Sequence, residues 1–513
     1  MKKKKQKPDK TLLKRVLIKG IRGQSQELTI GDAINLASGA YEKNLYDRAE
    51  LVLEQVIATA DNCSLAWLNL AQIYLVRLKY KEAKLAANKV ASLEQRNVRM
   101  LLDSASILSA LQSEQSALST LERLIKLSPN NGEAFSLLGD IYGRLDQKEK
   151  ALSCLKRAVK LHPDKARMLW NLTAYSPSTA QNYTREMERI LEKETTNEHA
   201  QALTLFSLAK INNHQKKYHE EYEHLIKANH LINQNHPWNE EIVQSNLNIA
   251  NQLIPKMKSF TPPCHSSINS TPILICALPR SGTTLIERIL GSHSMVTATG
   301  ESNIMNGAIM RQSEFLFKDV FFAKGLNQSN LDTFTNGASK IANETIEAFS
   351  ITTQYFVDKT IANVWSVGPS LLTSPNAKAI YIERNPADIF ISCFQHVFGN
   401  GINYAYSPDD FIAYYNVTSA LMERWRSTFP ERILTIKYED LVLEQKKVTQ
   451  KLLDFCNLDW EEACLQFHKS SGSVHTASVT QVRQKLYSSS SEKWRKYVDV
   501  LPQEIIALAE LYS

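Results

Sequence analysis

A period of 34 residues runs through the first third of the chain and constrains its fold more than any other feature. Rows that start at Ile30, Ser64, Val98 and Gly132 have a small residue at both the eighth and the twentieth position. Two antiparallel helices can approach closely only where neither presents a bulky side chain at the crossing point. The period therefore predicts four consecutive helix pairs stacked side by side. The small residues are Ala37, Ala71, Ala105 and Gly139 at the eighth position and Ala49, Ala83, Ala117 and Ala151 at the twentieth.

This pattern resembles the tetratricopeptide repeat. The resemblance implies an all-α, right-handed solenoid with a concave face over residues 30–165. A fifth row fails at Thr173 and Arg185, and a shifted copy begins near Leu203. Residues 166–259 are therefore interpreted as degenerate helical repeats. Arrays of this kind bind peptides or proteins, or they act as scaffolds and homodimer surfaces, and the sequence favours neither role.

Charge and composition limit the classes of protein to consider. The formal net charge of the 513 residues is +7, and a lysine run within 1–29 contributes much of it. We interpret this segment as a solvated basic tail and lead-in, with a tether to nucleic acid or an acidic membrane as the alternative. No nucleic acid is expected as a partner. The chain has no apolar run long enough for a transmembrane helix, no apolar signal-peptide segment and seven scattered cysteines, which fits a reducing cytoplasm.

A Pro- and Ser-rich linker at 260–271 precedes a second domain at 272–513. This domain opens with a short apolar segment, the motif PRSGTT at 279–284 and an amphipathic segment, which together predict strand, loop and helix. Loop N–H groups and a helix N-terminus form a concave positive site for a phosphate. A nucleotide triphosphatase or kinase of the P-loop class needs a lysine after the last glycine. Here Thr283 follows Gly282, and nothing in the motif requires a metal.

A second strand–turn–helix unit carries Arg384 and Ser392, eight residues apart. An arginine fork and a hydroxyl together suit a phosphate monoester. Arg384 follows Arg280 by 104 residues, and each arginine comes at the end of its own predicted strand. The two units together indicate two phosphate sites in one domain.

These two motifs resemble the donor site of sulfotransferases that use 3′-phosphoadenosine-5′-phosphosulfate (PAPS). The likeness is greatest to the tyrosylprotein sulfotransferases and their bacterial repeat-bearing relatives. It implies an α/β P-loop-like domain with a central parallel sheet, no metal, and transfer of a sulfuryl group to an acceptor hydroxyl. The resemblance places the 3′-phosphate on Arg384 and Ser392. It places the 5′-phosphosulfate on Arg280, Ser281, Gly282, Thr283 and Thr284.

The same resemblance implies the catalytic groups. The family's general base is a glutamate 21 positions after the loop arginine, which is Glu301 here. Lys359 matches a lysine that stabilises charge on the bridging oxygen. Ser478, 16 residues before Trp494, would contact the phosphosulfate. Two further residues would lie along the nucleotide, Tyr438 near the adenine or ribose and Lys485 in the donor loop.

Three positions depart from the family pattern. Asn303 replaces an arginine of the tyrosine-sulfating enzymes, and Lys485 stands where proline is common. His396 replaces a third arginine that binds the 3′-phosphate, and a neutral histidine would grip it less strongly. The acceptor therefore stays open among peptidyl tyrosine, a glycan, a lipid headgroup and a small phenol. The alternative function is a non-catalytic tetratricopeptide adaptor with a degenerate nucleotide-binding domain. Without a membrane anchor, the resemblance favours a bacterial, cytoplasmic protein.

Overall fold

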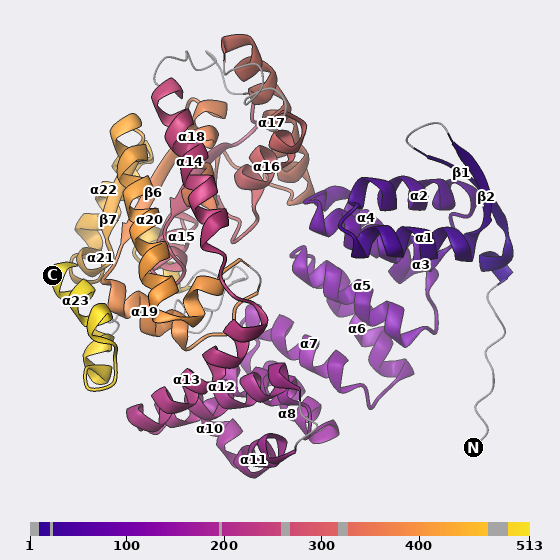
Figure 1. Ribbon diagram of the computed structural model, residues 1–513, viewed down its shortest axis with the longest axis horizontal. Helices are drawn as coiled ribbons and strands as arrows, with labels where there is room; N and C mark the ends of the chain where they lie inside the picture. Colours follow the sequence, from indigo (N-terminus) through magenta and orange to yellow (C-terminus); the bar gives the residue numbers. More distant parts are fainter. Residues whose placement is uncertain are drawn as a thin grey trace. The chain divides into compact units, whose positions relative to one another are not determined.

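The computed structural model describes residues 10–20, 24–193, 197–257, 267–316, 327–399, 401–469 and 491–512. The chain divides into two compact units, residues 1–141 and 142–513 (Figure 1). The division falls inside the helix α7, Gly132–Arg144.

The first unit consists of helix pairs that begin where the rows of the 34-residue period begin. Each pair packs on the next, as α2 does on α3 and α4 on α5. The turn within each pair contains a residue with positive φ at the same repeat position, namely Asn44, Leu78 and Gln112. The helices are α1 (Ile30–Glu42), α2 (Tyr46–Thr59), α3 (Ser64–Val76), α4 (Tyr80–Leu93), α5 (Val98–Ala110) and α6 (Glu114–Leu127).

The small residues of the period lie in the helix contacts. Ala37, Ala71 and Ala105 are each at most 1% exposed. Ala49 and Ala83, at the twentieth position, have no exposed surface. A larger side chain at these places would push the paired helices apart. The close approach that the sequence pattern predicts is therefore present.

A β-hairpin precedes the first helix, although the sequence pattern indicated only a tail and lead-in there. Strand β1 (Arg15–Lys19) pairs antiparallel with β2 (Ser25–Thr29). The hairpin buries Val16 and Ile18, and the backbone N–H of Lys19 donates to Gln55 Oε1 of α2 at 2.7 Å. The alternation of buried apolar residues in β1 is limited to Val16 and Ile18, which is too short a pattern to predict a strand from the sequence.

The second unit begins with further helices that follow α8 (Lys148–Leu161). Helices α12 and α13 form a hairpin in which Ala209 and Ala228 are buried, as the shifted repeat copy predicts. Helix α14 differs, because it packs against helices of the α/β domain instead of continuing the array. The helices are α9 (Ala166–Tyr175), α10 (Pro177–Ala180), α11 (Thr184–Glu192), α12 (Glu198–His214), α13 (Tyr218–Asn235) and α14 (Glu240–Met257).

A five-stranded sheet forms the centre of the α/β domain. Its order is β4-β5-β3-β6-β7, and all four neighbouring pairs are parallel. The predicted fold class, a helical repeat region followed by an α/β domain with a parallel sheet, is confirmed. The strands are β3 (Thr271–Cys276), β4 (Val296–Ala298), β5 (Tyr355–Asp358), β6 (Lys378–Glu383) and β7 (Ile433–Lys437).

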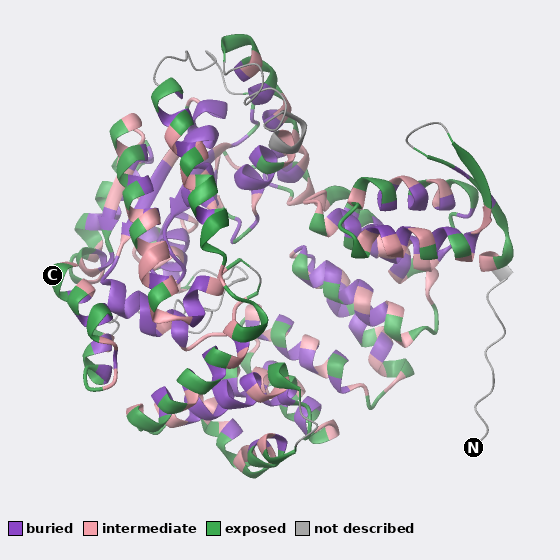
Figure 2. Ribbon diagram, in the orientation of Figure 1, coloured by how far each residue is buried: buried purple, intermediate pink, exposed green. Residues whose placement is uncertain are grey.

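Helices cover both faces of this sheet, so its strands are largely buried (Figure 2). Alternate residues of β3 point to opposite faces: Leu274 packs in one apolar cluster and Ile273 in the other. One cluster includes α14, α16 (Ile304–Leu316), α17 (Gln328–Ala348), α18 (Asn363–Thr373) and α20 (Pro408–Thr428). The other includes α15 (Thr283–Leu290), α21 (Tyr438–Leu443) and α22 (Gln445–Phe455).

Candidate active site

Each of the five parallel strands ends beside a residue or motif that the sequence singled out. The PRSGTT motif (279–284) follows β3, and Glu301 follows β4. Lys359, Arg384 and Tyr438 follow β5, β6 and β7. Because the carboxyl ends of parallel strands lie at one edge of a sheet, the fold brings these groups to a common edge.

The loop between β3 and α15 packs closely against the Tyr438 ring at Gly282. Gly282 has φ 101°, and an added Cβ would lie 2.4 Å from Cδ2 of Tyr438. Only glycine fits there. Thr283 and Thr284 form the first turn of α15, whose leading N–H groups lack intrahelical acceptors. Ser281 is fully buried, and no residue within the described part of the chain hydrogen-bonds its Oγ, which is therefore available to an anion.

The two phosphate motifs meet in one site. Nε of Arg280 donates to Oγ of Ser392 at 2.9 Å, and Nη1 of Arg384 donates to the Arg280 carbonyl at 2.7 Å. The Arg384 guanidinium also lies 4.4 Å from the ring centroid of Tyr438, which orients it by a cation–π contact. Two guanidinium groups and a hydroxyl are thus held together in an arrangement that suits phosphate oxygens.

His396 lies beside this site, one turn after Ser392. Its Nδ1 donates to the Ser392 carbonyl at 2.7 Å. Burial, followed by the charges of Arg280 and Lys210, lowers the pKa of His396 well below its ordinary value. The ring is therefore neutral near pH 7. In that form Nε2 carries a lone pair instead of a proton.

Three charged side chains form a row at the ends of β4 and β5. Nζ of Lys359 lies 3.0 Å from Oε1 of Glu301 and 4.0 Å from Oε2 of Glu287. The Glu301 side chain is 47% exposed, whereas those of Lys359 and Glu287 are buried. The exposed carboxylate of Glu301 is thus backed by a buried ammonium and a second, buried carboxylate.

Glu287 was not identified from the sequence, where it was only one residue of an amphipathic segment. Its Oε1 accepts a hydrogen bond from the backbone N–H of Gly300 at 2.5 Å, immediately before Glu301. Burial raises the pKa of Glu287, and the nearby Lys359 charge opposes this effect. Glu287 therefore holds both the loop that carries Glu301 and the Lys359 ammonium.

The backbone around Asn303 is also fixed by β5. The N–H of Asn303 donates to Oγ1 of Thr360 at 2.9 Å, and Asn303 has φ 55°. Oγ1 of Thr360 donates in turn to Oδ1 of Asp358 at 2.6 Å. These bonds set the direction in which the chain leaves Glu301 and enters α16.

Two more charged residues of the site were missed in the sequence. Asp388 of α19 (Pro386–Phe394) accepts hydrogen bonds from the N–H groups of Glu492 and Trp494 and lies 3.8 Å from Nη2 of Arg384. This brings Lys493 beside the arginines. Burial, then the charges of Arg384 and Arg280, lowers the pKa of Lys493 to about 8. The neighbouring Trp494, by whose spacing Ser478 was identified, was the only sequence signal for it.

Ser478 and Lys485 lie outside the described residues. In the ranges that the structure describes, no helix has the length and apolar character to span a membrane. The same ranges contain no group of three or more His, Cys, Asp or Glu residues that could hold a metal ion.

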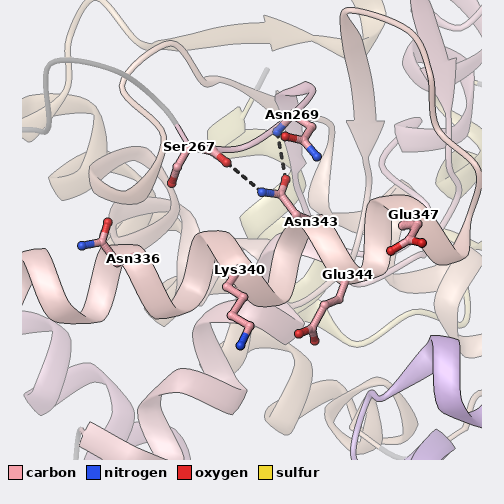
Figure 3. A pocket seen from close by; sticks show the side chains of 7 residues that line it. All are labelled: Ser267, Asn269, Asn336, Lys340, Asn343, Glu344 and Glu347. Carbon is pink, nitrogen blue, oxygen red and sulfur yellow. Dashed lines mark hydrogen bonds between the residues drawn. The ribbon is translucent and has the colours of Figure 1, made fainter.

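A pocket of the second unit is separate from these residues (Figure 3). It lies along α17, where Asn343 accepts a hydrogen bond from the N–H of Asn269 and donates one to the carbonyl of Ser267. These two bonds tie the start of the α/β domain to α17. None of the candidate site residues lines this pocket.

Comparisons with known proteins support the two parts of the chain separately. Residues 272–462 match the model of the sulfotransferase family, and residues 34–97 and 132–165 match models of the tetratricopeptide repeat. An uncharacterized protein of Aquifex aeolicus (strain VF5) is 32% identical over 344 residues, which cover 63% of this chain and 43% of that protein. The chain therefore spans less than half of this relative's length.

Two solved structures are similar to the second part. The sulfotransferase domain from the Synechococcus PCC 7002 olefin synthase has 20% identity and a TM-score of 0.36, covering 49% of this chain and 98% of that chain. The sulfotransferase domain from the curacin biosynthetic pathway has 20% identity and a TM-score of 0.33, covering 48% and 98%.

Proposed function

We propose that this chain, which combines tetratricopeptide repeats with a sulfotransferase-family domain, transfers a sulfuryl group from PAPS to an acceptor hydroxyl. The observation that carries the proposal is the hydrogen bond from Arg280 Nε to Ser392 Oγ, which is 2.9 Å long. It joins two residues that are 112 positions apart in the sequence. It unites two phosphate motifs in one site, as a donor with phosphate groups on both the 3′ and the 5′ oxygen of one ribose requires.

The residues present fit such a donor. The buried Ser281 hydroxyl, which has no hydrogen-bond partner among the described residues, and the N-terminus of α15 suit the 5′-phosphosulfate. Arg384 and Ser392 suit the 3′-phosphate. Tyr438, which packs against both Gly282 and Arg384, would hold the nucleoside between the residues that bind its 5′ and 3′ groups.

PAPS supplies a sulfuryl group bonded to a phosphate that can leave. Glu301 is the general base that takes the acceptor hydroxyl proton, and its 47% exposure gives the acceptor access. The buried ammonium of Lys359 stabilises negative charge that develops beside it. Transfer of this kind depends mainly on alignment and charge neutralisation, which the hydrogen-bonded strand ends provide.

The acceptor carries a hydroxyl, and we extend the proposal to a protein or peptide acceptor because the same chain carries tetratricopeptide repeats. This extension rests on architecture alone. It predicts that a truncated chain without residues 30–165 sulfates small phenols as well as the full chain but loses its macromolecular acceptor.

Calorimetric titration of the full chain with adenosine 3′,5′-bisphosphate, without metal, tests the donor site. We expect micromolar binding that is weakened by Ser392→Ala and by Arg384→Ala, with circular dichroism as the control for folding. A folded protein that does not bind this nucleotide would contradict the proposal and favour the non-catalytic adaptor.

A further inference from the structure

The helical hairpin α12–α13 is packed onto the donor end of the α/β domain. Phe206 of α12 and Leu225 of α13 belong to one buried apolar cluster with Phe390 and Phe394 of α19. Trp494 of the segment that ends the chain lies in the same cluster. Helix α19 carries Ser392, and Nδ2 of Asn229 on α13 donates to the carbonyl of Phe394 on α19 at 2.9 Å, so the hairpin is in direct contact with the element that presents the proposed 3′-phosphate ligand.

A buried polar network fixes this packing in one arrangement. Oε1 of Glu221 accepts from Nε2 of Gln395 at 2.7 Å, and its Oε2 accepts from the Tyr497 hydroxyl at 2.9 Å and from Nδ2 of Asn213 at 2.8 Å. Glu221 is 1% exposed. A satisfied network of this kind rigidifies the groups that it joins. The network therefore fixes the positions of the hairpin, the end of α19 and the Tyr497 segment relative to one another.

Lys210 lies on α12 one turn before Asn213, on the side that faces this network. Burial and the charge of Arg280 lower the pKa of Lys210 to about 8, while the carboxylate of Glu221 opposes them. The charges of Arg280 and Lys210 also lower the pKa of His396, whose ring is bonded to Ser392. Lys210 is thus electrostatically coupled to Arg280, which is hydrogen-bonded to the proposed 3′-phosphate ligand Ser392, and to His396.

We propose that Lys210 of the helical region is a ligand of the donor's 3′-phosphate, so that the α12–α13 hairpin forms part of the donor site. The inference rests on the proposed function. Its physical basis is an excess of positive charge: Arg280 lies close to Lys210, Arg384 and Lys493, and His396 is neutral. Like charges in a partly desolvated site repel one another, and a phosphate dianion removes that cost.

An alternative role for Lys210 is purely structural. Its ammonium lies 5.9 Å from the centroid of the Trp170 ring and near the Glu221 carboxylate, which it could serve as a counter-ion. A structural lysine would affect binding of every nucleotide alike, through the packing of α12. A phosphate ligand would affect only nucleotides with a 3′-phosphate.

The test compares adenosine 3′,5′-bisphosphate with adenosine 5′-monophosphate by calorimetry on the full chain. In Lys210→Gln we expect the bisphosphate affinity to fall about 10-fold or more, since a hydrogen bond to a charged group is lost, and the monophosphate affinity to stay the same. Lys210→Arg should keep most of the preference for the bisphosphate. Lys227→Gln, an exposed lysine of α13, is the matched control and should leave both affinities unchanged.

Equal loss of both affinities in Lys210→Gln, or no loss of either, would overturn the inference while leaving the proposed function intact. Failure of the folded wild-type chain to bind the bisphosphate would overturn the proposed function and this inference together. The melting temperature of each variant shows whether the α12–α13 packing has survived, and Lys210→Arg provides a second variant if Lys210→Gln does not fold.

Discussion

Lys359 donates a hydrogen bond to Glu301 across 3.0 Å, although 58 residues separate them in the sequence. The pair exists because β4 and β5 are parallel neighbours, so that both strands deliver the next residues to the same edge. The backbone N–H of Lys359 also donates to the carbonyl of Gly300 at 3.2 Å. A carboxylate and an ammonium that would be solvated on an isolated strand end are thereby held at a fixed separation.

Replacing the exposed Glu301 carboxylate should lower the rate of turnover without changing the affinity for the nucleotide. Glu301→Gln keeps the size of the side chain and removes its basicity, so turnover should fall by about 10²–10⁴. Affinity for adenosine 3′,5′-bisphosphate should stay nearly constant, because Glu301 is not among the proposed phosphate ligands. Single-turnover rates and calorimetry measure the two effects. Unchanged turnover would remove Glu301 from the mechanism.

Glu287 should matter for stability as well as for turnover. In Glu287→Ala the N–H of Gly300 loses its acceptor, so we expect a loss of about 1–3 kcal/mol in the free energy of unfolding. Glu287→Gln keeps an acceptor oxygen and should be closer to the wild type in urea unfolding. Both variants should lower turnover more than donor affinity, because the loop of Glu301 is displaced. Equal stability of the two variants would show that the Gly300 bond is unimportant.

Gly282 should tolerate no side chain. Gly282→Ala places a Cβ 2.4 Å from Tyr438 at a φ of 101°, which together should cost about 1–3 kcal/mol and weaken nucleotide binding. The matched control is Gly39→Ala in the middle of α1, where an added Cβ meets nothing within 4 Å. That change should stabilise the chain by about 0.5–1 kcal/mol. Thermal melts and calorimetric titration distinguish the two, and normal binding by Gly282→Ala would contradict the described loop.

Nucleotide binding should be accompanied by proton uptake near pH 8. Lys210 and Lys493 both have pKa values lowered to about 8, so part of each population is neutral in the free protein at that pH. A bound phosphate stabilises the ammonium form and raises these pKa values, so affinity should decrease as the pH rises through 8. The charged groups that face the two lysines are Arg280, Arg384 and Lys496, with Glu221 and Asp388 opposing them.

Calorimetry at pH 8 in two buffers of different ionisation enthalpy counts the protons. We expect net uptake in the wild type and less uptake in Lys210→Gln. Release of protons, or the same uptake in both proteins, would show that Lys210 does not face the phosphate.

Local patterns in the sequence were sufficient for much of the fold. The 34-residue period predicted where α1, α3 and α5 begin, because side chains at a helix crossing repeat with the helices themselves. Short apolar segments that end at the PRSGTT motif and at Arg384 predicted β3 and β6 and the residues that follow them. Parallel pairing then implies a common edge for Arg280, Glu301 and Lys359, since the edge follows from strand direction.

Contacts between distant segments were decided only by the tertiary structure. Glu287 and Asp388 have no distinctive sequence context; their roles come from bonds to Gly300 and Trp494, which lie on other elements. In the sequence, Lys210 is one lysine of a degenerate repeat. The helical pattern of α14 is that of the preceding repeats, and only its packing on the α/β domain distinguishes it from them. Periodicity shows which residues share a face of the same helix or strand. It does not show which distant element packs against that face, because this depends on how whole elements pack together.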